Sequence, residues 1–390
     1  MLRAALVLSL AVTTCAGAAA TQDVPARNSL ALGEPWAGRL ANGVQLTREG
    51  ADHFTWDPVL RHTPNRGWRR WGTVRLVRTV LTVLAEYRAA HPEAPRVGIG
   101  DLSRPHGGDF GRKFGGIGHA SHQNGLDVDI YYPRRDQLER EPFRVAQIDR
   151  PLAQELVDRF VRAGATKVFV GPRTGLHGPR RIVRRLIHHD NHLHVRLRND
   201  PPRRVLLGDS VDGRAIYAYR IGNPSARRLL VVGTIHGTEP AGLAVTRGLL
   251  RIAPPLHTEL WIVPTINPDG LARGTRANAA GVDLNRDFHH FSQPETRIAR
   301  TLIRRIRPNL SVWFHQPQGL VRAYGPSVSV GRRYAALAHE RYRTLAWPPG
   351  TAARWQNGLG ERSFVVELGP GRLRARAAAR HVRAILALAG

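Results

Sequence analysis

The first half of the chain contains two helical patterns among short strand-like runs. Apolar residues recur at helical spacing from Trp71 to Ala90, and the pair His91-Pro92 ends the run, so a buried helix is predicted there. A second helix is predicted after Asp149, because Pro151 favours the first helical turn and apolar residues follow on one face. Extended runs at 96–99, 126–131, 167–170 and 193–197 are typical of short strands.

The second half shows a different pattern, in which strands alternate with helices. The predicted strands are 229–232, 260–266, 311–314 and 364–368, and the predicted helices are 241–252, 295–306 and a final segment rich in Arg and Ala. Alternation of this kind indicates an α/β sheet that helices cover on both faces. Ligands are then expected at the carboxyl ends of the strands.

A break between the two patterns marks a domain boundary. The run Arg198-Asn199-Asp200-Pro201-Pro202 interrupts any regular element. A chain of 390 residues is long enough for two domains, each with its own apolar core. With 42% hydrophobic and 23% charged residues, the composition excludes a disordered chain. We therefore predict one domain at 35–200 and another at 203–390.

The first residues have the layout of a secretory signal. Arg3 precedes an apolar run at 4–12, and small residues end at Ala20. We predict a cleaved signal peptide at 1–20 and no transmembrane segment in the mature chain, since the run falls short of the roughly 20 apolar residues of a span. The single cysteine, Cys15, leaves lipidation as the alternative. A mature chain without cysteine must hold any transition metal through histidine and carboxylate.

The chain is strongly basic, with a formal net charge of +28. Lysine occurs only at 113 and 167, so 58 minus 2 leaves 56 arginines. A positive field of this size attracts polyanions. The sequence lacks aromatic-basic repeats and zinc-finger spacing, so we expect attraction to an anionic cell wall rather than to nucleic acid. The predicted location is periplasmic, or secreted and associated with the cell wall.

A first candidate site combines a loop with two strand-like segments. Alternation along the strand puts Asp127 and Asp129 on one face, and His192 and His194 have the same i, i+2 relation further on. Two histidines and one carboxylate, with water in the fourth position, form the open ligand set of a catalytic zinc. The spacing alone does not show which of the two aspartates is the ligand. The alternative without a metal is that these residues are ordinary hydrogen-bonded polar groups.

Three separated motifs resemble the penicillin-insensitive murein endopeptidase family, a group of LAS-type zinc peptidases. They are residues 100–108, 118–129 and 190–196, in the family's order, within a resemblance that covers Trp71 to Arg198. It implies a small antiparallel-sheet zinc domain that cleaves D-alanyl-diaminopimelate crosslinks of wall peptides. By this match the zinc ligands are His122, Asp129 and His194, and the catalytic imidazole is His192, with His189 nearby. A second family metal would use His119 with a downstream Asp-x-x-His, which the first half of the chain lacks.

A second candidate site lies where a predicted strand gives way to a helix. His236 and Glu239 stand three residues apart at this corner, and His315 ends another predicted strand. Such corners of an open sheet bind ligands. Taken alone, however, a His-x-x-Glu pair is better interpreted as a solvated His-Glu pair.

Further motifs in this half resemble the zinc carboxypeptidase family, in particular its compact murein peptide amidase branch. They are residues 267–270, 273–278 and 281–286, within a resemblance that covers Arg204 to Gly390. It implies a mixed-sheet α/β/α domain with zinc held by His236, Glu239 and His315, a clamp on a substrate carboxylate by Asn285 and Arg286, carbonyl polarisation by Arg273 and a general base at Glu367. Glu367 could alternatively be a buried ion-pair partner. Tyr324 and Tyr342 are candidates for the family's tyrosine.

Together these features predict an exported peptidoglycan hydrolase with one zinc ion in each domain. The first domain would open peptide crosslinks and the second would trim wall peptides as a carboxypeptidase or amidase. Two alternatives stay open: the second half could be a general carboxypeptidase or deacylase, or one half could be a wall-binding module without turnover.

Overall fold

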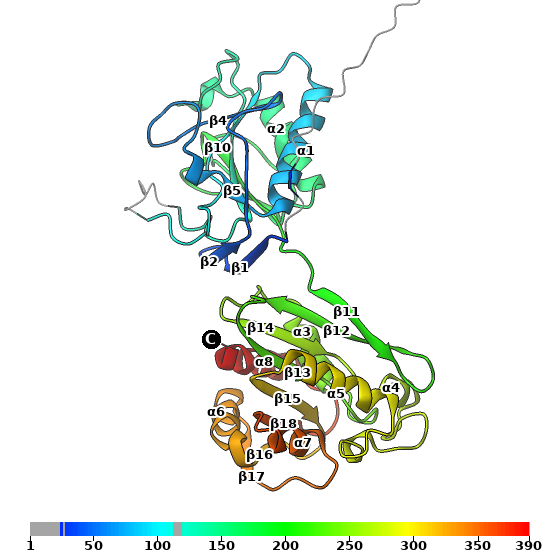
Figure 1. Cartoon of the computed structure of the whole chain (residues 1–390). Coiled ribbons are helices and arrows are strands. Elements are labelled where there is room, and N and C mark those ends of the chain that lie inside the picture. The colour runs from blue at the N-terminus through cyan, green and yellow to red at the C-terminus, as the bar shows by residue number, and fades with distance from the viewer. Residues whose placement is uncertain (1–23, 26–27, 112–118, 390) are drawn as a thin grey trace, which may run out of the picture.

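The computed structural model describes residues 24–25, 28–111 and 119–389. The predicted signal peptide, including Cys15, lies outside the described residues. Two separate sheets, each with its own helices, occupy the two halves of the chain (Figure 1).

The first domain is built on a six-stranded sheet with an antiparallel centre. Its strands, in spatial order, are β4 (His53–Thr55), β6 (Val97–Ile99), β7 (Asp127–Tyr131), β10 (His192–Arg196), β8 (Lys167–Val170) and β9 (Val183–Arg185). The four central strands pair antiparallel, whereas the outer strands β4 and β9 run parallel to their neighbours. The predicted small antiparallel sheet is therefore confirmed, with a parallel strand added at each edge.

Two helices cover one face of this sheet and leave the other for polar side chains. Apolar residues of α1 (Val74–Ala90) and α2 (Arg150–Arg162) pack with Val128 and Val195, which alternate along β7 and β10 with the polar residues Asp129 and His194. The helices lie side by side in Figure 1. The period of two along each strand thus separates an apolar core from a face that carries the candidate site.

Side-chain caps fix where both helices begin. Thr73 accepts a hydrogen bond from the backbone N–H of Leu76, and Asp149 accepts one from Leu152. The first helix therefore begins at Val74, and not at Trp71 as the apolar pattern predicts, because Trp71–Gly72 pairs as β5 with β3 (Val44–Gln45). The remaining small elements here are the hairpin of β1 (Leu30–Glu34) and β2 (Ala37–Ala41) and the short helices η1 (Gly67–Arg69) and η3 (Val145–Gln147).

The second domain contains a mixed eight-stranded sheet. Its strands, in spatial order, are β11 (Arg203–Asp209), β12 (Ala215–Gly222), β14 (Thr258–Val263), β13 (Arg227–Val232), β15 (Leu310–His315), β18 (Ser363–Glu367), β16 (Leu320–Ala323) and β17 (Arg341–Thr344). The four strands from β14 to β18 are parallel, and antiparallel pairs flank them on both sides. The carboxyl ends of the parallel strands therefore meet at one edge.

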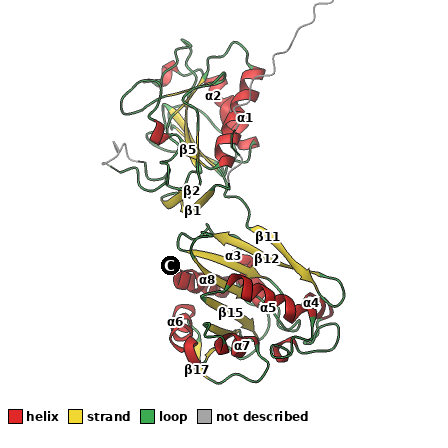
Figure 2. Ribbon diagram, in the orientation of Figure 1, coloured by secondary structure: helices red, strands yellow, loops and turns green. Residues whose placement is uncertain are grey.

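Helices cover both faces of this sheet (Figure 2). One layer contains α3 (Gly242–Leu249), α6 (Val328–Ala338) and α8 (Ala375–Ala389), and the other contains α5 (Pro294–Ile306) and α7 (Ala352–Gly358). Successive residues of β13 alternate between the two cores, with Val231 in the first and Val232 in the second. The predicted α/β/α arrangement is confirmed. The short helices α4 (Pro268–Arg273), η4 (Leu284–Arg286) and η5 (Gly325–Ser327) complete the domain.

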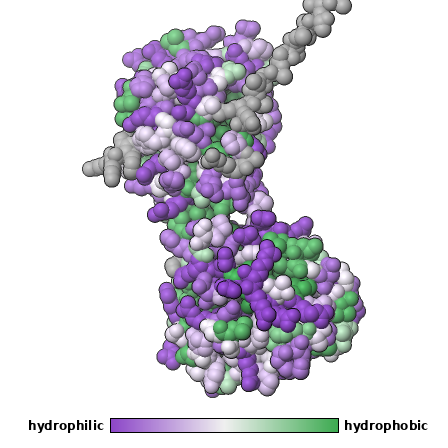
Figure 3. Space-filling model, in the orientation of Figure 1, coloured by the Kyte–Doolittle hydropathy of each residue, from purple (hydrophilic) through white to green (hydrophobic). Residues whose placement is uncertain are grey.

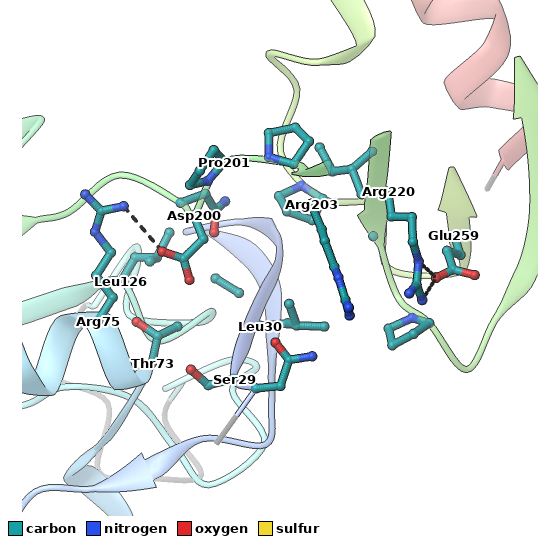
Figure 4. Close-up of a pocket in the computed structure, with 18 residues that line it drawn as sticks. Ser29, Leu30, Thr73, Arg75, Leu126, Asp200, Pro201, Arg203, Arg220 and Glu259 are labelled. Carbon is teal, nitrogen blue, oxygen red and sulfur yellow. Dashed lines mark hydrogen bonds and ion pairs between the residues drawn. The ribbon is translucent and has the colours of Figure 1, made fainter. Parts of the chain in front are cut away.

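A segment without helix or strand joins the two sheets between Arg196 and Arg203. Residues of both halves line a cavity of about 150 Å³ beside it (Figure 4). Asp200 forms an ion pair with Arg75 at 3.3 Å, and Arg220 donates from Nε to Glu259 at 2.9 Å. Neither of the candidate metal sites lines this cavity.

The face of the molecule that Figure 3 shows is mainly hydrophilic. Hydrophilic residues spread over much of the visible face of both domains (Figure 3). Among the described residues, none of the helices combines the length and the apolar character that crossing a membrane requires.

We predict that a buried histidine makes the second domain sensitive to acid. Burial lowers the pKa of His381 to about 4, and its Nδ1 lies 2.9 Å from the hydroxyl of Tyr334. In the unfolded chain this histidine binds a proton near pH 6.5. The contribution of neutral His381 to the free energy of unfolding is therefore fully present above that pH and is lost as the pH falls toward 4. Between pH 7.5 and 5.5 the free energy of unfolding should fall by about 1 kcal/mol more in the native chain than in His381→Asn. Denaturant titrations with equal pH slopes for both chains would contradict this assignment.

Candidate metal centres

Three side chains of the first domain converge on one point. His122 precedes β7, Asp129 lies on β7, and His194 lies directly opposite Asp129 on β10. His122 Nε2 is 3.2 Å from His194 Nδ1 and 3.3 Å from Asp129 Oδ1, and the last two atoms are 3.1 Å apart. All three side chains are buried. The pairing register of β7 and β10 thus positions two of the three side chains, Asp129 and His194.

The outer ring nitrogens determine where each imidazole carries its proton. His122 Nδ1 donates to the carbonyl of Leu102 at 2.6 Å, and His194 Nε2 donates to Asp127 Oδ1 at 3.1 Å. Assigned in this way, His122 Nε2 and His194 Nδ1 direct lone pairs toward each other and toward Asp129 Oδ1. That oxygen is buried and has no hydrogen-bond partner among the described residues. Converging lone pairs repel unless a cation lies between them, and this donor set suits zinc.

The two aspartates of β7 have different surroundings, which the spacing could not distinguish. Asp129 faces the two inward imidazole nitrogens, whereas Asp127 binds the outer nitrogen of His194 and accepts from Arg196 Nε at 2.6 Å. Although burial opposes it, Asp127 and Asp129 raise the pKa of His194 to about 9. Without a metal, the cluster therefore attracts a proton to the place that a cation would fill.

The backbone of His122 is held in an uncommon conformation. Its φ is +69°, a left-handed value that is unfavourable for a residue with a Cβ. Asp127 Oδ2 accepts the backbone N–H of His122 at 3.1 Å. The same carboxylate therefore stabilises both the strained loop and the ring of His194, which marks a constrained site rather than a loose surface turn.

A hydrogen-bonded chain orients the other strand histidine. His192 Nδ1 is 2.7 Å from Asn191 Oδ1, and Asn191 Nδ2 donates to Glu141 at 2.7 Å. His192 Nε2 lies 3.6 Å from Asp129 Oδ1, and burial lowers the pKa of His192 to about 4. His192 is thus neutral near pH 7, with an accepting Nε2 beside the cluster. The ring of His189 lies 4.8 Å from that of His192.

Two groups that the sequence analysis did not assign to this site lie around the first cluster. His119 Nε2 is 2.8 Å from Asp101 Oδ2, and its Nδ1 is 3.9 Å from Asp129 Oδ2, so His119 joins His122 and Asp129 in a second set of potential ligands. Trp36, which is 56% exposed, lines the same cavity of about 690 Å³ as the histidines. The pair His119 and His122 was visible in the sequence, whereas nothing in the sequence could place Trp36 there.

The second domain brings together the other predicted trio. His236 Nδ1 lies 3.0 Å from Glu239 Oε1, and His315 Nδ1 lies 3.0 Å from Glu239 Oε2. All three side chains are buried, and His236 Nδ1 has no hydrogen-bond partner among the described residues. His236 Nε2 donates to Asp283 Oδ1 at 2.9 Å, so the unprotonated Nδ1 faces the carboxylate. Two imidazole nitrogens beside one carboxylate again form a donor set that fits a zinc ion.

The loop between His236 and Glu239 requires a glycine. A Cβ at Gly237 would lie 2.0 Å from the backbone of Gly270, so any side chain would displace the loop. Arg276 also contacts this loop, since it donates from Nη1 to Glu239 Oε1 at 2.8 Å. A close backbone approach and an ion pair thus fix the position of the carboxylate.

Glu367 lies beside this cluster at the end of β18. It pairs with His315 in the parallel register, and its Oε2 is buried without a hydrogen-bond partner among the described residues. Burial first, and then the nearby carboxylate of Glu239, raise the pKa of Glu367 to about 7. A carboxyl group of this kind can exchange a proton near neutral pH.

The remaining predicted residues are more dispersed. Arg273 forms an ion pair with Asp212 at 2.7 Å, so Arg276 is the arginine that contacts Glu239 in this structure. Asn285 Oδ1 accepts from the backbone of Ala352, and Arg286 donates to the carbonyl of Asn285. Of the two candidate tyrosines, Tyr342 donates to Val328 of α6 at 3.2 Å, and Tyr324 is 49% exposed.

Comparisons with known proteins assign a family to each half. Residues 31–170 match the penicillin-insensitive murein endopeptidase family, and residues 195–344 match the zinc carboxypeptidase family. His194 and Glu367 lie beyond these matched ranges, so for them the geometry is the independent argument.

Individual relatives agree with these matches. Murein peptide amidase A of Escherichia coli K12 is 30% identical over 206 residues, covering 44% of this chain and 83% of that protein. Penicillin-insensitive murein endopeptidase of Salmonella heidelberg is 35% identical over 130 residues, covering 26% of this chain and 44% of that protein. Carboxypeptidase SOL1 of Arabidopsis thaliana is 32% identical, and the match spans 28% of its length. The solved murein-tripeptide amidase MpaA of Escherichia coli O157 aligns at 25% identity with a TM-score of 0.43, covering 48% of this chain and 92% of that one.

The fold and the matched families define a metallopeptidase with two peptidase domains and zinc as the metal. Through its second half, the chain belongs to the zinc carboxypeptidase family.

We predict different consequences when the two aspartates of β7 are replaced. Asp129→Asn should nearly abolish zinc binding in the first domain. Asp127→Asn should weaken zinc affinity about 10- to 100-fold, because Asp127 orients His194 and the loop of His122 but is not itself a ligand. Asp158→Asn, on the far helix α2, should leave affinity unchanged and serves as control. Chelator competition with metal analysis measures the difference, and equal losses for both aspartates would refute the distinction.

Proposed function

We propose that this protein is an exported peptidoglycan hydrolase with one catalytic zinc in each half. His122, Asp129 and His194 would hold the first ion, and His236, Glu239 and His315 the second. The observation that carries the proposal is the convergence of imidazole nitrogens and carboxylate oxygens in two buried clusters. The names of the relatives supply the substrate, because one of each half's relatives acts on murein. The periplasm or the cell wall is the matching location.

The first domain would cleave crosslinks between wall peptides. When bound, zinc supplies a Lewis acid that polarises the scissile carbonyl and lowers the pKa of water. His192 would accept the proton at Nε2, because Asn191 holds its other nitrogen. The walls of the cavity, including Trp36 and Phe169, would exclude bulk water from the peptide.

The second domain would trim the opened peptides as a carboxypeptidase or amidase. Glu367 would take the proton and return it to the leaving amine, as its pKa near 7 allows. Asn285 and Arg286 would hold a substrate carboxylate, for which a planar guanidinium is suited. Arg273 would steady the oxyanion after leaving its exposed pairing with Asp212.

Domain-specific variants test this assignment. We expect His194→Ala to lower the opening of crosslinked muropeptides at least about 100-fold and to leave trimming intact, and His315→Ala to do the reverse, because each loses a zinc ligand. Mass spectrometry of the products separates the two activities. His177→Ala, an exposed histidine outside both clusters, is the matched control.

Three outcomes would contradict parts of the proposal. If the zinc-loaded native chain leaves every muropeptide intact, the hydrolase assignment is wrong. Release of C-terminal residues from unrelated peptides would indicate a general carboxypeptidase. If one histidine variant changes nothing, that domain acts as a wall-binding module.

Two neighbouring arginines of the second domain should separate binding from catalysis. Arg276→Gln should weaken zinc affinity there about tenfold, because it removes a contact with Glu239. Arg273→Gln should lower kcat about 100-fold at unchanged zinc content, because it removes an oxyanion partner. Metal analysis and steady-state kinetics of the trimming step measure both effects, and the reverse pattern would assign the catalytic role to Arg276.

A further inference from the structure

A second groove adjoins the zinc cavity of the first domain. It has a volume of about 950 Å³ and shares Ile187 and His188 with that cavity. Its walls also include Glu141 and Asn191, the two residues that orient His192. A ligand in this groove therefore lies beside the residues that orient the candidate catalytic imidazole.

Positive charge exceeds negative charge along the groove. Four arginines line it, namely Arg61, Arg144, Arg150 and Arg173, against two carboxylates. Asp190 is paired with Arg173 at 2.6 Å, and Glu141 is buried and accepts from Asn191. Within the described ranges, Arg61, Arg144 and Arg150 are exposed and form no ion pair with a carboxylate. Three guanidinium groups thus remain available to an anionic ligand.

The groove also offers apolar surface beside these charges. Phe143 is 52% exposed and Ile187 is 64% exposed, and both line the groove. The guanidinium of Arg61 lies 5.9 Å from the ring centre of Phe143. Guanidinium groups near an aromatic ring keep their N–H groups free to bind carboxylate in a bidentate manner. Aliphatic chains that end in carboxylates match both features.

We propose that this groove binds the carboxylate-bearing arm of the peptide whose bond the first domain cleaves. The inference rests on the proposed function and adds a specificity element to it. D-glutamyl and diaminopimelyl residues of wall peptides carry free carboxylates on short aliphatic chains, so they meet the guanidinium groups and the apolar wall together. The groove shares Ile187 and His188 with the zinc cavity. We therefore expect its ligand to be part of the substrate and not a separate polyanion.

Kinetics with a charge-neutral substrate test the proposal. The double variant Arg144→Gln/Arg150→Gln should raise KM for a crosslinked muropeptide dimer about tenfold, with kcat within about twofold, since only a binding contact is lost. For the same dimer with its carboxyl groups amidated, variant and native chain should have equal KM. Arg184→Gln, an exposed arginine of β9 outside the groove, should match the native chain with both substrates. An unchanged KM, or an equal rise with the amidated dimer, overturns the proposal.

A binding measurement separates this inference from the proposed function. Calorimetry with the zinc-loaded His192→Ala/Glu367→Gln chain measures dimer affinity without turnover in either domain. If the native chain cleaves nothing but the carboxylate dimer still binds more tightly than the amidated dimer, and the arginine variant removes that difference, the groove assignment stands while the hydrolase assignment fails. Absence of charge-dependent binding overturns the groove assignment.

Discussion

The interaction on which both sites depend is the hydrogen bond that holds the outer nitrogen of an imidazole. Leu102 and Asp127 bind the outer nitrogens of the two histidines in the first domain, and Asp283 binds that of His236 in the second. Each bond fixes a tautomer and directs the other lone pair inward. Without these acceptors the rings could turn or carry their protons inward, and neither cluster would offer an ordered set of donors to a metal.

The two sheets position similar sets of ligands in different ways. In the first domain, antiparallel register places His194 opposite Asp129 in the middle of the sheet, on the face that helices leave free. In the second, the ligands come from loops and strand ends at the carboxyl edge of parallel strands, where His315 ends β15 beside Glu367 of β18. The first site is thus built by strand alternation and the second by strand termination.

Much of this could be predicted from the sequence, and the failures have physical causes. The helix at 150–162 and strands such as 167–170 follow from caps and apolar periodicity, which are local. The outer strands β11, β12, β16 and β17 were not predicted. Strands β16 and β17 have only four residues each, and the sheet that gives β11 and β12 their place is assembled from segments far along the chain. The clusters themselves were anticipated through motifs. The hydrogen bond from Asn191 to Glu141 was not anticipated, because these residues are 50 positions apart in the sequence and only the fold brings them together.

Neither cluster contains sulfur, since every candidate ligand atom is an imidazole nitrogen or a carboxylate oxygen. Oxidants that convert thiolates to sulfenic acids or disulfides therefore have no ligand to attack at these sites. Peroxide leaves such a donor set unchanged, whereas acid competes with the ion for the same lone pairs. Retention of the metals is thus coupled to proton concentration and is independent of the redox poise of the surroundings.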